Sequence, residues 1–408
     1  MSSLNFEVIK ERNALIIFMS QLITSVADKM LSLGLIWYVT KNLGANNVPW
    51  FLTCAFLPHL IFSFFTTKII HKLGTIKTML YSSAFRGVVL LIYFILLSTS
   101  HIESHLFSYS LFLMIFLIGI GSSVFTPAVL SCPPLLVKDD KIIALNGLLD
   151  STLSISNILG AALSVFLLNY ISIEQLILLN SICFFIAVFM QFKLKTIHEE
   201  DSSSEIKEHV SPLSVLKKYS EIAKMLMVFL IFNIVLTPIF VLIPWYVEKI
   251  YLGDSSSLAL IEGGLGLGAF LMGLFISLTH VEVSAKNRVK MIAIICFLFG
   301  VFFTLFSFSK HTWQGASILF LIGAASTFLN IQVLTFFQTG AEETDVPAIM
   351  TSVNLISNAS MPLSLTFSGL IFPYVNVPSF ALWSGALVIV LAFILPPLIS
   401  SKPNGSIQ

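Results

Sequence analysis

Apolar and polar residues follow each other in long blocks along this chain. Apolar segments fall at 14–40, 46–70, 76–98, 106–130, 142–168, 172–193, 223–249, 256–279, 287–309, 313–338, 346–372 and 377–400. A helix of about 20 apolar residues crosses a hydrocarbon core of about 30 Å, and each segment reaches that length. The pattern predicts an all-α polytopic membrane protein with twelve transmembrane helices in two six-helix halves.

One extended polar stretch, rich in serine and charge, separates the sixth apolar segment from the seventh. Such a stretch has too little apolar surface to bury itself. We therefore expect an N-terminal six-helix bundle over 1–193, a cytoplasmic linker over 194–222 and a C-terminal bundle with a short tail over 223–408.

Composition supports the same class, because 56% of the residues are hydrophobic and only 11% are charged. Soluble domains average about 25% charged residues. The 22 basic and 21 acidic residues leave a formal net charge of only +1, too little to attract nucleic acid. The sequence has no nucleotide-binding, hydrolase or metal-ligand motif. These features predict a non-enzymatic protein in a lipid bilayer, without cofactor, metal site or catalytic residue.

The basic residues predict the orientation of the spans. Most of the 22 lysines and arginines gather on one side when the N-terminus is placed in the cytoplasm. Cytoplasmic loops carry such an excess. Both termini and the linker are therefore expected inside. Arg86 is interpreted here as an anchor near the cytoplasmic end of the third span.

The two halves echo each other in short stretches. Trp37-Tyr38-Val39 at the end of the first span matches Trp245-Tyr246-Val247 at the end of the seventh, and Ile155-Ser156-Asn157 matches Ile356-Ser357-Asn358. Duplicated six-span halves build transporters whose site lies near the membrane midplane, between the repeats.

Polar residues form one stripe on the first span. Gln21, Thr24 and Asp28 are separated by three and four residues, which places them on one helix face. Ionisable groups inside a membrane are costly and usually functional. Asp28 is predicted to bind the coupling proton in a central cavity. The alternative is a structural hydrogen bond between helices.

Two further acidic residues are candidates for proton coupling. Asp150, on the same face of the fifth span as Asn157, would share or relay a proton with Asp28, because burial and mutual repulsion both raise the pKa of a carboxyl group. The alternative places Asp150 in water at the mouth. Glu262, near the outer end of the eighth span, is either a proton exit or an interfacial group. The glycines after it predict close helix packing.

Neutral polar and aromatic residues supply candidate substrate contacts in a cavity lined from both halves. The predicted substrate-binding residues are Gln21, Thr24, Trp37, Asn157, Trp245, Gln332, Asn354 and Asn358. His59, after Pro58, is interpreted as a polar group at a helix kink.

With these residues in place, the sequence resembles major facilitator transporters of the third drug:proton antiporter group, which includes macrolide efflux proteins and enterobactin-type siderophore exporters. SQLITSVAD at 20–28 resembles the Q-x-x-S-x-x-G-D opening of that group and puts Asp28 on its acidic position. The resemblance implies a monomer in the bacterial inner membrane.

The loop after the second span departs from the family pattern G-x-L-x-D-R. His71 stands at the aspartate position and Lys72 at the arginine position, with Lys77 following. In the family this loop gates the switch between states. The span-five motif G-P-x-x-G-G reads GAALSV here, so proton coupling is less firmly implied than the fold.

The prediction is an exporter of a small amphipathic compound, a drug such as a macrolide or a siderophore, driven by proton antiport with alternating access. Three alternatives stay open: a lysophospholipid or other lipid flippase, a facilitated-diffusion or uptake carrier of the same fold, and a non-transporting membrane partner. NGLLDST at 146–152 resembles the flippase sequence, but the cations expected for a phosphate headgroup are missing at Val129 and around Thr237.

Overall fold

The computed structural model describes residues 8, 10–99, 104–138, 141–168, 170–195, 218–279, 283–342 and 345–399. The chain forms two compact units. The first comprises 1–205 with 254–259, and the second comprises 206–253 with 260–408. Over the described residues every regular element is a helix. Residues 196–217 of the predicted linker lie outside the described residues.

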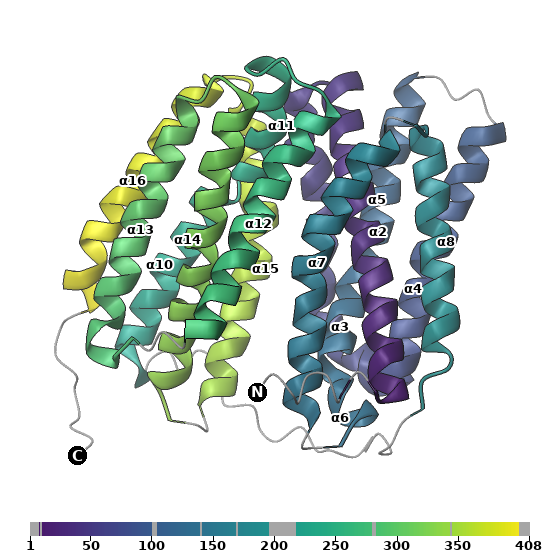
Figure 1. Ribbon diagram of the computed structural model, residues 1–408, viewed down its shortest axis with the longest axis horizontal. Coiled ribbons are helices and arrows are strands. Elements are labelled where there is room, and N and C mark those ends of the chain that lie inside the picture. The colour runs from purple at the N-terminus through teal and green to yellow at the C-terminus, as the bar shows by residue number, and fades with distance from the viewer. Residues whose placement is uncertain are drawn as a thin grey trace. The chain divides into compact units, whose positions relative to one another are not determined.

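The first unit contains the helices that match the first six predicted spans. They are α2 (Arg12–Asn42), α3 (Val48–Leu73), α4 (Thr75–Thr99), α5 (Ser104–Ser131), α7 (Ile142–Leu168) and α8 (Ile173–Gln191), with a 3-10 turn η1 (Ala45–Asn47) and a short helix α6 (Pro133–Leu136). Within this unit α2 packs on α7 and α8, α4 packs on α5 and α8, and α3 packs on α5. Figure 1 shows them running side by side as a bundle.

The second unit contains the remaining six predicted spans. They are α10 (Ser220–Leu236) with α11 (Ile239–Lys249), α12 (Ser255–Thr279), α13 (Ala285–Ser307), α14 (Thr312–Thr339), α15 (Val346–Ile371) and α16 (Val377–Ile399). The span predicted over 223–249 is interrupted between α10 and α11, where Pro238 has no N–H to donate to the preceding turn. Within the unit, α13 packs on α14 and α16, and α10 packs on α15 and α16.

Many helices present apolar side chains to their surroundings. Ile92, Ile95 and Phe189 are among large hydrophobic residues that are about half exposed or more. Among the described residues, nine segments are long and apolar enough to cross a membrane, with α10 and α11 counted as one segment. The chain is therefore a multi-pass membrane protein whose outward apolar faces meet lipid.

Glycines bring α12 and α14 into close contact, as the sequence predicts. A Cβ added at Gly268 would clash with the carbonyl oxygen of Phe320, and one added at Gly323 would clash with the carbonyl oxygen of Leu265. The backbones of the two helices therefore touch at these points, which is the packing typical of small residues in membrane helices.

Candidate functional site

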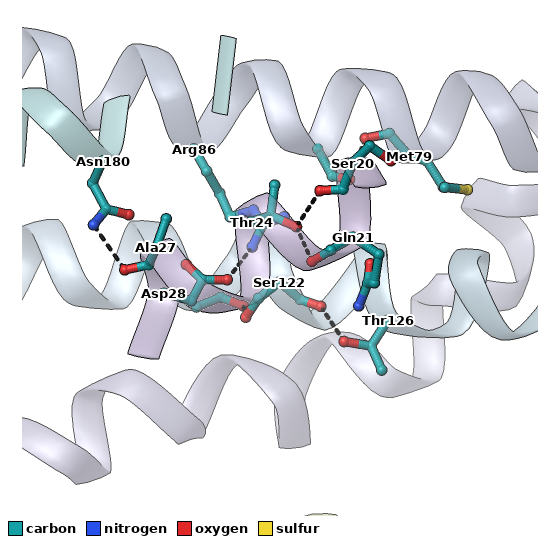
Figure 2. Close-up of polar contacts among 12 residues, drawn as sticks. Ser20, Gln21, Thr24, Ala27, Asp28, Met79, Arg86, Ser122, Thr126 and Asn180 are labelled. Carbon is teal, nitrogen blue, oxygen red and sulfur yellow. Dashed lines mark hydrogen bonds and ion pairs between the residues drawn. The ribbon is translucent and has the colours of Figure 1, made fainter. Parts of the chain in front are cut away.

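An ion pair joins α2 to α4 inside the first unit. The Nη1 atom of Arg86 donates a hydrogen bond of 3.0 Å to Oδ2 of Asp28. The two partners differ in accessibility, because the Arg86 side chain is 1% exposed and the Asp28 side chain is 40% exposed. Figure 2 shows the two side chains pointing toward each other. Asp28 is thus the member of the pair that a proton or a solute can reach.

Aromatic rings surround the cation of this pair. The guanidinium carbon of Arg86 lies 4.6 Å from the ring centroid of Phe125 on α5 and 4.3 Å from that of Phe184 on α8. Cations are attracted to the faces of aromatic rings. Gly121 on α5 leaves room for the arginine, since an added Cβ there would lie 2.5 Å from Cγ of Arg86. The guanidinium is therefore held by packing as well as by Asp28.

The position of Arg86 corrects the interpretation of it as an anchor near the cytoplasmic end. Arg86 is eleven residues beyond the first residue of α4, about 16 Å along the helix at 1.5 Å per residue. At that depth a lone cation is costly, and it is stabilised here by the carboxylate of Asp28. The signal was present in the sequence, because Arg86 falls in the middle of the apolar segment 76–98.

The polar residues along one face of α2 differ in their hydrogen-bond partners. The hydroxyl of Thr24 is buried and donates to the backbone carbonyls of Ser20 and Gln21, at 3.0 and 3.1 Å. Figure 2 shows these bonds beside the ion pair. Oε1 of Gln21 is buried and has no hydrogen-bond partner. Thr24 thus bonds to its own helix, while the predicted roles of Thr24 and Gln21 in substrate binding stay predictions.

His59 lies on α3 and pairs with α5. Its Nε2 is 3.0 Å from Oγ of Ser122, which is next to Gly121 in the chain. His59 follows Pro58 inside α3, as the sequence indicates. The contact links α3 to the helix that packs against Arg86.

The other candidates of the first unit are dispersed. Asn157 on α7 is half-buried, and Trp37 near the end of α2 has the ammonium of Lys41 4.9 Å from its ring centroid. The side chain of Asp150 lies outside the described residues, so its predicted part in proton coupling is untouched by the structure.

The predicted gating loop is a single residue between two helices. Gly74 connects α3 to α4 with a φ of 84°, a conformation that favours glycine. Lys72 and Lys77 on either side are exposed. The side chain of His71 lies outside the described residues.

In the second unit the candidates lie on four helices, α11, α12, α14 and α15. Gln332 on α14 is buried, whereas Asn354 and Asn358 are both exposed and lie one turn apart on α15. The ring of Trp245 packs against that of Tyr246 at 5.7 Å. Glu262 on α12 is buried at 5% exposure. The predicted substrate-binding roles of these residues stay predictions.

A second set of charges lies at the end of this unit where α10 begins. Nζ of Lys218 is 2.8 Å from Oδ2 of Asp345 and 3.2 Å from Oε2 of Glu342, and the hydroxyl of Tyr219 donates to the same Asp345 oxygen at 2.9 Å. These hydrogen bonds from Lys218 and Tyr219 hold the pKa of Asp345 below its usual range. They also raise the pKa of Lys218, chiefly through Asp345. The cluster fastens the loop before α15 to the start of α10.

Comparison with known families agrees with the two bundles and the polar residues buried within them. The model of the Major Facilitator Superfamily matches residues 17–365. The chain belongs to the Major Facilitator Superfamily. It is a transporter, and not an enzyme.

Relatives of this superfamily member include a drug exporter. Macrolide efflux protein A of Streptococcus pyogenes is 22% identical over 399 residues, which cover 93% of this chain and 94% of the relative. The uncharacterized MFS-type transporter YvqJ of Bacillus subtilis (strain 168) is 22% identical over 376 residues, covering 88% and 86% of the two chains. These similarities are consistent with a drug-efflux group of the superfamily.

Solved structures of superfamily members share the fold. The nucleoside transporter NupG has a TM-score of 0.73 at 12% identity, over 95% of this chain and 99% of that chain. A POT family transporter in complex with 5-aminolevulinic acid has a TM-score of 0.71 at 11% identity, over 96% and 97%. The predicted all-α major facilitator fold is thereby confirmed.

Proposed function

We propose that this transporter exports a small amphipathic drug-like compound, such as a macrolide, across the bacterial inner membrane by proton antiport. The observation that carries the proposal is the Asp28–Arg86 ion pair among the apolar helices of the first unit. The similarity to macrolide efflux protein A supports the direction and the substrate class. Siderophore export rests on the resemblance of the sequence alone.

The ion pair has the properties of a proton-coupling site. Asp28 is accessible and Arg86 is not, so a proton arrives at the carboxylate and cancels its charge while the guanidinium stays in place between Phe125 and Phe184. Protonation weakens the pair, because the neutral carboxyl no longer attracts the cation. Asp28 then changes its contacts, and the two bundles exchange between inward-open and outward-open states.

In this scheme α15 of the second unit contributes substrate contacts. Asn354 and Asn358 on α15 offer neutral donors and acceptors on one exposed helix face.

The energy available from proton coupling limits the solute gradient. A proton entering down 100 mV releases about 2.3 kcal/mol. Since about 1.4 kcal/mol corresponds to a factor of ten, that energy sustains roughly a 50-fold gradient of a neutral solute.

Proton movement in inverted membrane vesicles tests this function. Erythromycin added to energised vesicles is expected to release protons from the acidic lumen in the wild type, and Asp28→Asn is expected to abolish the release. Asp254→Asn is the matched control, because it makes the same chemical change at an exposed residue outside the apolar helices. Asn replaces Asp well at such a helix start.

Two results would contradict the proposal. One is an equal response of Asp28→Asn and the wild type. The other is accumulation of radiolabelled erythromycin that an uncoupler leaves unchanged, which would identify a facilitator instead.

A further inference from the structure

Helix α8 lies against both helices that form the ion pair, since it packs on α2 and on α4. Its middle contains Asn180 and Ser181 within the apolar sequence LILLNSICFF. Both residues are fully buried. Buried polar groups are costly unless they are hydrogen-bonded, so their partners indicate what they do.

The partners lie directly beside the two members of the ion pair. Nδ2 of Asn180 donates to the carbonyl oxygen of Ala27 at 2.8 Å, and Ala27 precedes Asp28. Oγ of Ser181 donates to the carbonyl oxygen of Gly87 at 2.8 Å, and Gly87 follows Arg86. Two consecutive residues of α8 therefore fasten the backbone next to the anion and the backbone next to the cation. Figure 2 shows the Asn180 bond alongside the Asp28–Arg86 pair.

Phe184 extends the same contact by one turn. It is fully buried, and its ring lies against the guanidinium of Arg86. Gly87 lets α8 approach this closely, because an added Cβ would lie 3.2 Å from Cβ of Phe184. Helix α8 thus contacts the guanidinium of the ion pair through Phe184, and bonds to the backbone next to each member of the pair through Asn180 and Ser181.

We propose that Asn180, Ser181 and Phe184 are positioning residues that fix the separation of Asp28 and Arg86 and so set the pH at which Asp28 takes up its proton. The inference rests on the proposed function of Asp28 as the proton carrier. A cation beside a carboxylate favours the ionised form, and the effect falls as the two groups separate. Loosening α8 is therefore expected to make Asp28 bind its proton at higher pH.

Substitutions of Asn180, Ser181 and Phe184 leave the other charged and titratable groups near the ion pair chemically unchanged. These groups are Lys29 next to Asp28 on α2, Cys183 on α8, which interacts with the charge of Asp28, and His59 on α3, which interacts with the charge of Arg86; on α7 the side chain of Asp150 lies outside the described residues. A shift in these variants therefore reports on the geometry of the pair.

The test measures protonation of Asp28 without transport. The purified full-length protein in lipid nanodiscs is treated with dicyclohexylcarbodiimide, which modifies protonated carboxyl groups, across a range of pH. Mass spectrometry of the peptide containing Asp28 gives the labelling midpoint. We expect the double variant Asn180→Leu, Ser181→Ala to move that midpoint upward by about one pH unit, a fraction of the roughly 1–3 units that a neighbouring cation is worth.

Matched variants separate positioning from general packing. Phe184→Leu should also raise the labelling midpoint. Phe184→Tyr keeps a ring on the guanidinium and should have the wild-type midpoint. Tyr93→Phe removes a different interhelical hydrogen bond of α4, the 3.2 Å contact with Ser110 on α5, and should leave the midpoint unchanged. Ser181→Ala alone is the mildest variant, and serves if the double variant does not fold.

The inference is overturned if the α8 variants keep the wild-type midpoint, or if Tyr93→Phe shifts it equally. It is also overturned if Asp28 stays unlabelled in every variant, because a loosened pair would leave it protonated within the range. Failure of the proposed function looks different: the midpoint would move as expected while erythromycin fails to move protons in vesicles.

Discussion

Two ion pairs of the protein have similar distances and differ in which partner is buried. Arg86 contacts Asp28 at 3.0 Å with side-chain exposures of 1% and 40%, and Lys218 contacts Asp345 at 2.8 Å with side-chain exposures of 50% and 10%. Exposed pairs contribute little to stability because water and salt screen them. When one partner of a buried pair is lost, the other is left as an uncompensated charge. Although the two ion pairs have similar distances, we therefore expect the loss of one partner to destabilise the protein by different amounts.

The sharpest way to test this comparison is to remove the carboxylate that compensates the buried cation. Asp28→Asn leaves the guanidinium of Arg86, which is buried between two aromatic rings, as an uncompensated charge. We expect the free energy of unfolding to fall by about 3 kcal/mol. Thermal unfolding of the detergent-solubilised protein measures the loss.

The double variant Asp28→Asn, Arg86→Gln is the control for that experiment, since it replaces the ion pair by two neutral amides. It should recover part of the lost stability without restoring transport. Equal melting temperatures for the single and the double variant would show that the pair is not coupled.

A change of intermediate size is expected where α12 meets α14. Gly268→Ala places a methyl group against the carbonyl oxygen of Phe320, and overpacking of this kind costs about 1–3 kcal/mol. Gly263→Ala is the matched control on the same helix, because nothing lies within 4 Å of an added Cβ there. Gly263→Ala should be neutral or slightly stabilising. Equal melting temperatures for both would refute the close packing.

The smallest change is expected at the Lys218–Asp345 pair, whose cation is half exposed and stays in contact with water when its partner is removed. Asp345→Asn should lower the melting temperature only slightly at pH 7. The folded state holds the pKa of Asp345 below its ordinary value of 3.8. Its contribution is therefore complete above about pH 4 and is lost as pH falls through the folded-state value.

The pKa of Lys218 is raised above its ordinary value of 10.5, so its contribution disappears only in strong alkali. The wild type and Asp345→Asn should accordingly differ most near neutrality and converge as the pH falls through the folded-state pKa of Asp345. A difference that stays constant from neutrality into acid would contradict this assignment.

The sequence predicted the fold well because hydrophobic length is a strong signal. Each predicted apolar segment corresponds to a long helix, or to the pair α10 and α11 where Pro238 interrupts the seventh. Gly264 and Gly268 of α12 were also interpreted correctly as sites of close packing, whereas Gly263 meets open space. Positions of charges within a span were harder to interpret.

Arg86 illustrates the difficulty. The positive-inside rule counts basic residues by side, and that count assigned Arg86 to the cytoplasmic end although it lies in the middle of an apolar segment. Asp28 was identified because its helix face was polar. Asn180 and Ser181 are visible in the sequence only as polar residues within an apolar run. Their role depends on which carbonyl groups α8 meets, and no local pattern in one sequence encodes that contact.

Proton release on drug binding tests the central claim most directly. Erythromycin is added to the purified protein in weakly buffered detergent solution at a pH where Asp28 is protonated, and a pH indicator counts the protons released while calorimetry measures binding. By reciprocity, a drug that displaces the proton must bind more weakly as pH falls. The account predicts release of about one proton per bound drug in the wild type and none in Asp28→Asn. Drug binding with no proton release from the wild type, or with equal release from Asp28→Asn, would contradict it.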